Sequence, residues 1–160
     1  MTMKWTFPND SEEGEERAAG FVLFRTIHQH RQYLLLRHRD GGHWAFPKGR
    51  LEREEGEIEA ALRETLEETG IRHIRPIPNF RETSSYIVSR NGQDKAKIVA
   101  YFLAEAEESD VSLSSEHTDY QWLELAEAVA TVTYAESQRI LTEADAWLVA
   151  ASERERDDRP

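Results

Sequence analysis

The stretch from Gly49 to Ile71 reads GRLEREEGEIEAALRETLEETGI, and its patterning decides much of the fold. Between Glu57 and Thr69, apolar and threonine side chains recur at spacings of three and four residues, which predicts an amphipathic α-helix. Gly70 follows directly, and a glycine at this position is typical of a helix C-terminus. We therefore expect one helix that begins at Glu57 and ends at Thr69.

Three glutamates share one side of this expected helix. With 100° of rotation per residue, Glu64, Glu67 and Glu68 fall within about 100° of one another, and we expect them to face outward. Ile58, Leu62 and Thr65 lie on the far side, which we expect to pack in the core. Like charges at these spacings repel, and carboxylates near a helix C-terminus oppose its macrodipole. A bound magnesium ion would reverse both effects, although a run of charges is more often a solvated helix face.

Length and composition indicate one globular domain. The chain has 160 residues, of which 39% are hydrophobic and 32% are charged, as expected for a core under a polar surface. The formal net charge of −11 and the lack of a basic stripe argue against a nucleic-acid partner. No apolar run predicts a membrane span, and the N-terminus lacks a signal-peptide pattern. The chain has no cysteine, which excludes thiolate chemistry and fits the cytoplasm.

Strand and helix patterns alternate along the chain, which predicts a layered α/β architecture. The dipeptide Asn91-Gly92 separates two strand patterns and predicts a hairpin turn. We expect a flexible acidic segment over residues 1–16, a single domain over residues 17–150 and a charged tail over residues 151–160. The expected strands cover residues 18–26, 32–38, 77–88, 96–106 and 120–125, a short extended piece covers residues 44–47, and a second helix covers residues 135–150.

The complete spacing within residues 49–71 is more specific than the three carboxylates alone. The stretch resembles the signature of the Nudix hydrolases at all seven of its invariant positions, which are Gly49, Glu55, Arg63, Glu64, Glu67, Glu68 and Gly70. Of the aliphatic positions of this signature, Ile71 fits, whereas Thr65 departs mildly. The resemblance implies an α/β/α sandwich around a mixed β-sheet, and divalent-metal-dependent hydrolysis of a nucleoside diphosphate linked to another group.

The resemblance implies a role for each matching residue. Glu67 and Glu68 match the main metal ligands, and Glu64 matches a further ligand or water-positioning carboxylate. Gly49 lets the backbone approach the metal, and Arg63 is expected to orient the carboxylates. The expected metal is Mg²⁺, with Mn²⁺ as an alternative. The general base is left open between Glu64 and, outside the signature, Glu116.

Residues around the signature narrow the resemblance to the branch that hydrolyses diadenosine tetraphosphate asymmetrically, giving ATP and AMP. The lead-in His43 to Gly49 reads HWAFPKG, and Ser115 to Trp122 reads SEHTDYQW. Tyr86 lies 16 residues after Gly70, where the resemblance implies an aromatic ring that stacks on adenine. The other implied substrate contacts are Tyr134 as a second aromatic face, and Lys48, Lys97 and His43 on the phosphate chain.

Other interpretations stay open at this point. The substrate of a related Nudix enzyme would be a nucleoside triphosphate, a diphosphoinositol polyphosphate or a capped RNA end, and a protein of another class would be a non-catalytic nucleotide sensor. Tyr86 could serve packing alone, His43 could cap the turn, and Glu116 could be an ordinary surface carboxylate. The expected partner is a small nucleotide, and the expected assembly is a monomer or a homodimer.

Overall fold

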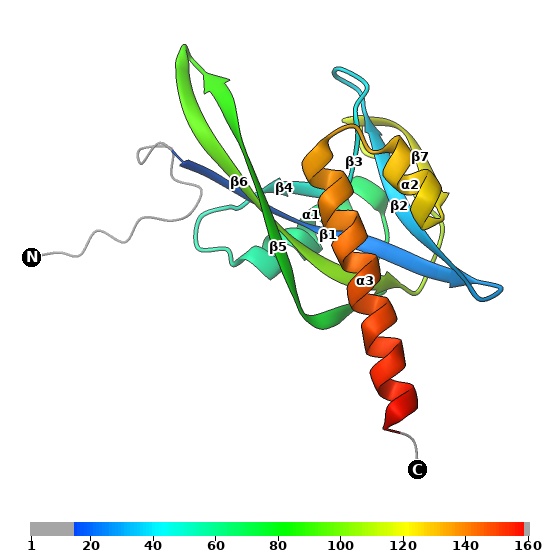
Figure 1. The fold of residues 1–160 in the computed structure, drawn as a ribbon. Coiled ribbons are helices and arrows are strands. Elements are labelled where there is room, and N and C mark those ends of the chain that lie inside the picture. The colour runs from blue at the N-terminus through cyan, green and yellow to red at the C-terminus, as the bar shows by residue number, and fades with distance from the viewer. Residues whose placement is uncertain (1–14, 159–160) are drawn as a thin grey trace, which may run out of the picture.

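The computed structural model describes residues 15–158. Their core is a mixed sheet in the strand order β3-β2-β1-β6-β5, with β4 paired to β1 and β7 paired to β2 (Figure 1). Among the described strands, β1 and β6 pair in parallel and the other pairs are antiparallel. The elements are β1 (Glu15–Ile27), β2 (His30–His38), β3 (Trp44–Ala45), β4 (Lys48–Arg50), α1 (Glu57–Thr69), β5 (Ile74–Arg90), β6 (Gln93–Ala106), β7 (His117–Leu123), α2 (Leu125–Thr131) and α3 (Ala135–Asp157).

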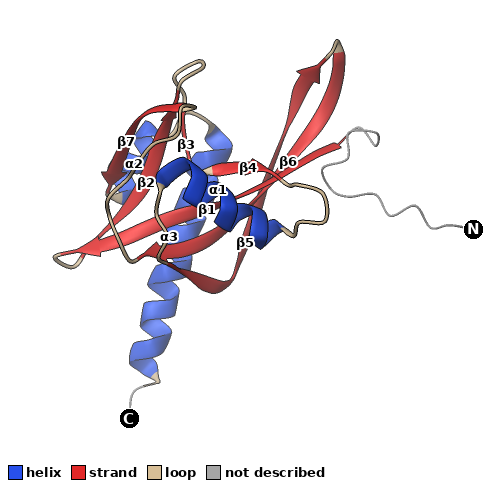
Figure 2. Cartoon of the chain, turned by 180° about the vertical axis from the view of Figure 1, so that it is seen from behind, coloured by secondary structure: helices blue, strands red, loops and turns tan. Residues whose placement is uncertain are grey.

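Two cores lie on the two faces of the sheet, because successive side chains of a strand point to opposite sides. In β1, Phe21 and Leu23 belong to the core that includes Ala60 and Ala61 of α1, whereas the neighbouring Val22 belongs to the core that includes residues of α2 and α3. Helix α3 crosses the near face of the sheet in Figure 1, and α1 crosses the near face when the molecule is turned by 180° in Figure 2. This arrangement confirms the predicted α/β/α sandwich.

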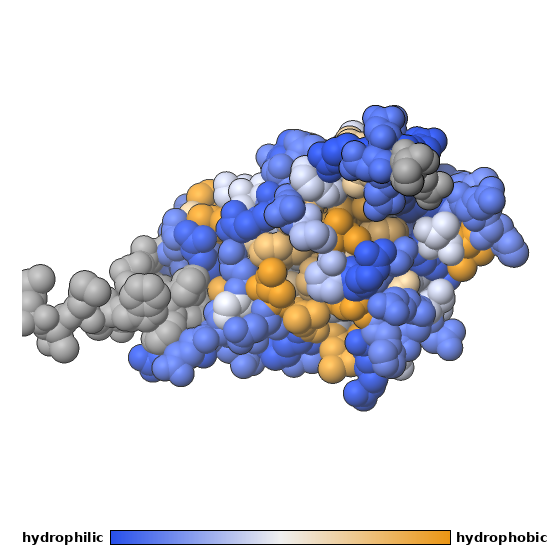
Figure 3. All heavy atoms as spheres, turned by 90° about the horizontal axis from the view of Figure 1, so that it is seen from below, coloured by the Kyte–Doolittle hydropathy of each residue, from blue (hydrophilic) through white to orange (hydrophobic). Residues whose placement is uncertain are grey.

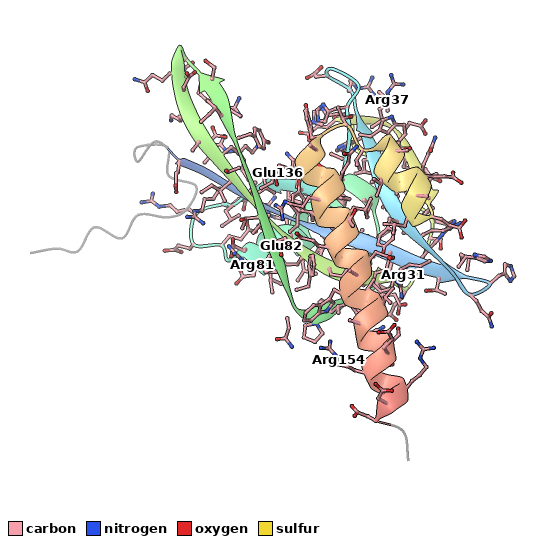
Figure 4. All side chains as sticks on the ribbon, in the orientation of Figure 1. Arg31, Arg37, Arg81, Glu82, Glu136 and Arg154 are labelled. Atoms are coloured by element: carbon pink, nitrogen blue, oxygen red, sulfur yellow. The ribbon has the colours of Figure 1, made fainter. Side chains whose placement is uncertain are left out.

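Polar contacts fasten the helices to the sheet. Arg139 of α3 donates to the carboxylate of Glu82 on β5 at 3.2 Å and to that of Glu136 at 2.7 Å; Figure 4 shows the two glutamates on neighbouring parts of β5 and α3. On the other helix, Arg81 of β5 donates to Glu57 in the first turn of α1 at 2.9 Å. The long strand β5 therefore holds both helix layers.

The limits of α1 agree with the prediction, but its buried face agrees only in part. The prediction that Thr65 faces the core is confirmed, since it is 1% exposed, whereas that for Ile58 and Leu62 is wrong, because these side chains are 47% and 40% exposed. The expectation that all three glutamates face outward is also wrong, because Glu68 is only 4% exposed. Small side chains let the helix approach the sheet closely on this face. The buried residues of α1 are Ala60, Ala61, Thr65, Glu68 and Thr69.

Exposed apolar side chains remain on the surface after this docking. Leu66 of α1 is 40% exposed, and Ile87 at the far end of β5 is 66% exposed. Figure 3, viewed from below, shows a hydrophobic patch surrounded by hydrophilic side chains. Over the described residues, no helix combines the length and the apolar character that a membrane span needs.

Several elements differ in extent from the predicted ones. Strand β1 begins at Glu15, inside the segment 1–16 expected to be flexible; residues 1–14 lie outside the described part. Helix α3 continues to Asp157, through most of the expected tail 151–160, because alanine, glutamate and arginine favour helix. Strand β4 and helix α2 were not predicted, since three and seven residues are too short for a periodic signal. The predicted turn at Asn91-Gly92 is confirmed, with φ of 52° and 78°.

Candidate active site

A cavity of about 330 Å³ opens between the end of α1, strand β4 and the loop before β7. Seven of the residues predicted for metal, catalysis or substrate line it. Arg50, His38 and His117 line it as well, and none of these three was predicted. The predicted residues in the lining are His43, Lys48, Gly49, Glu64, Glu68, Lys97 and Glu116.

Gly49 is glycine because the carboxylate of Glu64 occupies the place of a side chain. A Cβ atom built on Gly49 would lie 1.9 Å from the carboxyl carbon of Glu64 and 2.2 Å from its Oε1 atom. The Gly49 backbone conformation is not left-handed, since its φ is not among the positive values. Glycine is therefore required for steric reasons. Because Gly49 has no side chain, the backbone of β4 can lie against the carboxylate of Glu64 on α1.

Arg63 holds the carboxylates of the loop and the helix together. Its guanidinium donates from Nε and Nη2 to the two oxygens of Glu55 at 2.8 and 2.9 Å, and from Nη1 to Glu64 at 2.8 Å. It also donates to the backbone carbonyl of Arg50 at 2.9 Å. The hydrogen bond from Arg63 is the main reason that the pKa of Glu55 lies below its usual range, ahead of the opposing effect of burial. Glu55 thus joins the loop to the helix, and Arg63 fixes the direction of Glu64.

Glu68 is a buried carboxylate without a cationic partner among the described ion pairs. Its side chain accepts a hydrogen bond from the backbone N–H of Lys48 at 3.3 Å. Burial, and next the charge of Glu64, raise the pKa of Glu68 to about 8. Burial also raises the pKa of Glu64, against the hydrogen bond from Arg63, and the charge of Glu116 acts on both groups. Such crowding of acidic oxygens is unfavourable in the protein alone, and a hard divalent cation would relieve it.

Glu67 is placed differently from the other two helix glutamates. Its side chain is 57% exposed, it contacts Arg63 at 3.4 Å, and it is not among the residues that line the cavity. Over the described residues, no three acidic or histidine side chains are arranged closely enough to hold a metal ion directly. Glu64, Glu68 and Glu116 therefore share the cavity, whereas Glu67 would have to turn toward it to become a ligand.

Positive charge lines the other side of the cavity. Lys97 is only 9% exposed, and burial, followed by the charge of Lys48, lowers its pKa to about 8. A lysine in this environment is stabilised by any anion that enters the cavity. Arg50 and Lys48 flank Gly49 on β4 and also line the cavity. The carboxylates and the cations thus face the same space from two sides.

Aromatic rings surround the cavity. Tyr86 is 42% exposed, and its ring lies 5.9 Å from the Nζ atom of Lys97. Tyr134 is 55% exposed, and its ring centroid lies 5.6 Å from that of His43. The two tyrosines therefore border residues that line the cavity, with enough exposed surface to receive a planar group.

Two further histidines of this site, His38 and His117, were not predicted. The ring of His38 stacks on that of His43 with centroids 4.6 Å apart, and the ring of His117 meets His38 edge-on at 5.2 Å. Burial is the main reason that the pKa of His43 is lowered and that the pKa of His117 falls to about 4. All three rings come from segments that flank the predicted residues, but nothing in their spacing along the chain indicates that they meet.

Comparison with known proteins agrees with this geometry. The NUDIX domain model matches residues 14–144. The asymmetrical bis(5'-nucleosyl)-tetraphosphatase of Rattus norvegicus is 37% identical, with 82% of this chain and 95% of the relative covered. The Caenorhabditis elegans enzyme of the same name is 35% identical, with 82% and 96% covered.

Solved structures show the same likeness. A binary complex of the C. elegans Ap4A hydrolase superposes with a TM-score of 0.77 at 35% identity, over 84% of this chain and 98% of that chain. The E. coli dihydroneopterin triphosphate pyrophosphohydrolase superposes with a TM-score of 0.66 at 19% identity, over 79% and 92%, which shows a shared fold. Nudix hydrolases require a divalent metal, and these relatives support a small-molecule substrate. The signature at residues 49–71, the sandwich fold and these relatives together show that the chain belongs to the Nudix hydrolase family.

Proposed function

We propose that this Nudix hydrolase cleaves diadenosine tetraphosphate asymmetrically to ATP and AMP with Mg²⁺, with Mn²⁺ as an alternative metal. The observation that carries the proposal is the polarity of the cavity, in which Glu64 and Glu68 face Lys48 and Lys97. A phosphate chain can lie between these groups with the scissile anhydride near the carboxylates. The names of the rat and nematode relatives support the same substrate.

In this proposal the glutamates of α1 hold the metal. Glu64 and Glu68 line the cavity and would be ligands in their present positions. Glu67 would become a third ligand when its side chain turns inward. Gly49 contributes by letting its backbone approach the same place. When bound, the cation neutralises phosphate charge and lowers the pKa of the attacking water. The donor set contains oxygen atoms only, which suits magnesium or manganese.

The proton of the attacking water needs an acceptor. Glu116 and Glu64 are the two candidates, and the structure favours Glu116 because the Glu64 carboxylate already accepts a hydrogen bond from Arg63 at 2.8 Å. The backbone carbonyl of Glu116 accepts from the Arg39 N–H at 2.7 Å, which fixes the loop that presents the side chain. As water adds to the phosphorus, the base takes its proton and the bridging P–O bond breaks.

The remaining residues bind the substrate without taking part in bond cleavage. Lys48, Lys97 and His43 are proposed to contact the phosphates that leave as part of ATP. The exposed rings of Tyr86 and Tyr134 are proposed to hold an adenine between them, a contact worth about 1–3 kcal/mol per base. Since Lys97 lies next to the Tyr86 ring, the base and the first phosphates of one nucleotide would be bound together.

Product analysis with diadenosine tetraphosphate, labelled in one adenosine, tests the proposal. The expected products are ATP and AMP in equal amounts. A Glu68→Gln variant serves as a control that the activity belongs to this protein. Two molecules of ADP, or no cleavage, would contradict the proposal. In that case nucleoside triphosphates, diphosphoinositol polyphosphates and capped RNA are the next substrates to compare, and tight binding without turnover would identify a sensor.

Two further expectations accompany this proposal. We propose the cytoplasm as the compartment, because a chain without cysteine is suited to a reducing environment. Assembly as a monomer or a homodimer stays a prediction, which light scattering of the purified protein distinguishes.

A further inference from the structure

One face of the sheet concentrates positive charge beyond the two lysines assigned above. In the registers of the described strands, Arg50 pairs with Ala18, and Glu16 pairs with Lys97. On the neighbouring strand, Tyr86 pairs with Lys97, and Arg90 lies two alternations further along β5. Because side chains two residues apart share a face, Arg50, Glu16, Lys97, Tyr86 and Arg90 all belong to the same face of the sheet.

Glu16 anchors this group of cations. It is only 1% exposed, and it accepts hydrogen bonds from Nε and Nη2 of Arg90 at 2.9 and 3.3 Å. The bond from Arg90 is the main reason that its pKa is lowered, and the charges of Arg50 and Lys97 act in the same direction. Arg90, Arg50 and Lys97 thus surround a single buried carboxylate, and the group of cations keeps a net positive charge that an anion would offset.

Arg50 is an exposed cation at the edge of the cavity. No ion pair links it to any residue in the described range 15–158. Arg90 lies near the tip of the β5–β6 hairpin, which projects past the rest of the sheet in Figure 1. The chain as a whole carries a net charge of −11, which is enough to keep it soluble. The local cluster of positive charge therefore requires another explanation.

We propose that Arg50 and Arg90 extend the phosphate-binding wall of Lys48 and Lys97, and thereby set a preference for substrates with more than four linked phosphates. The inference deepens the proposed function and rests on it in taking a phosphate chain as the ligand. Each added phosphate brings further negative charge, and charge-assisted hydrogen bonds to a guanidinium are the strong class of such contacts. A longer phosphate chain would reach Arg50 and Arg90. A short phosphate chain cannot do so while it also contacts Glu64 and Glu68.

The test measures the affinity for inorganic tri-, tetra-, penta- and hexaphosphate by isothermal titration calorimetry, in the presence of excess magnesium. The natural protein is expected to bind more tightly with each added phosphate. Arg50→Gln is expected to weaken hexaphosphate binding about 3- to 10-fold, as for loss of a partly exposed ionic hydrogen bond, with little change for triphosphate. A loss that is equal at all lengths, or no loss, would overturn the inference.

Arg90 needs a matched design, because removing it alone leaves Glu16 buried without a counter-charge. The double change Glu16→Gln with Arg90→Gln keeps this pair neutral, and it is expected to reduce the hexaphosphate preference as Arg50→Gln does. Arg75→Gln is the control, since Arg75 also lies on β5 and pairs with Glu105 at 2.9 Å outside the cavity. A control variant that loses the same length preference would also overturn the inference.

Failure of the inference and failure of the proposed function give different results. If the natural protein cleaves diadenosine tetraphosphate to ATP and AMP but binds all polyphosphates equally, the extended wall is refuted and the proposed function stands. If binding tightens with length while no dinucleotide is cleaved, the extended wall stands and the substrate assignment is refuted. A comparison of kcat/KM for dinucleoside tetra- and hexaphosphates then shows whether the preference for longer phosphate chains also holds in catalysis.

Discussion

Replacing Gly49 with alanine should displace a carboxylate of the proposed metal site while leaving the fold in place. An added Cβ would lie 1.9 Å from the carboxyl carbon of Glu64, and ordinary contact begins at 3.4 Å, so the two must separate by 3.4 − 1.9 = 1.5 Å. Displacement of a positioned group by about 1 Å can cost 10²-fold in rate. We therefore expect kcat to fall about 100-fold or more, which corresponds to roughly 2.7 kcal/mol in the activation barrier.

The same substitution should have a smaller effect on folding. Alanine is compatible with the Gly49 backbone, so the cost comes from overpacking, which is about 1–3 kcal/mol. Thermal unfolding by circular dichroism measures this cost, and steady-state hydrolysis of diadenosine tetraphosphate measures kcat. Both measurements are made well below the melting temperature of the variant, so that the loss of rate reports on the site.

Gly56→Ala is the matched control, because it adds the same methyl group on the other side of the loop. The nearest atom to its Cβ is the Oε1 atom of Glu59 at 3.5 Å, and its φ of −79° suits alanine. We expect unchanged kcat and a change in stability of less than about 1 kcal/mol, because alanine restricts the unfolded chain whereas the N-cap of α1, which Gly56 occupies, favours glycine. If Gly49→Ala retained the kcat of the control, the steric account of the Gly49–Glu64 contact would be refuted.

Three other outcomes test the site. Glu67→Gln should remove most turnover with normal folding, and near-normal rates would contradict its proposed role as a ligand that turns inward. Tyr86→Ala should raise KM for dinucleotides far more than the inhibition constant of inorganic polyphosphate, and equal effects would refute adenine stacking. Because the pKa of Glu68 is raised to about 8 from 4.5, the metal-free fold holds a proton that the unfolded chain releases, so its stability falls as pH rises through this window. Magnesium replaces that proton, so melting curves should show a larger stabilisation by magnesium at about pH 8 than at about pH 6.

The sequence predicts the ends of α1 better than its orientation. Gly70 adopts a φ of 72° and its N–H bonds to the Leu66 carbonyl, which is local chemistry that the residue type alone indicates. The orientation depends on which side docks on the sheet, and here the alanines and threonines dock while Ile58 stays exposed. The rule that carboxylates face water fails at Glu68, because α1 docks with this side chain beside β4, where the backbone N–H of Lys48 donates to it.

The residues that line the cavity were predictable where they lie next to a motif. Lys48 adjoins Gly49, so its place in the cavity follows from the signature. His38 and His117 meet through the pairing of β2 with β7, in which they are register partners. Such pairing between distant segments depends on the whole sheet, and no pattern along a single strand contains it.

The three residues of β4 explain how opposite charges come to face one cavity. Side chains alternate along a strand, so the space above Gly49 is directed at α1, where Glu64 fills it. The side chains of Lys48 and Arg50 point to the opposite face of the sheet. On β1 their register partners are Gly20 and Ala18, and Glu16 on the same face of β1 pairs with Lys97 of β6. If this pairing shifted by one residue, the side chains of Lys48 and Arg50 would point toward α1, and Gly49 would take their place on the face that holds Lys97. The spacing between Lys48, Gly49 and Arg50 therefore matters to the site as much as their identities.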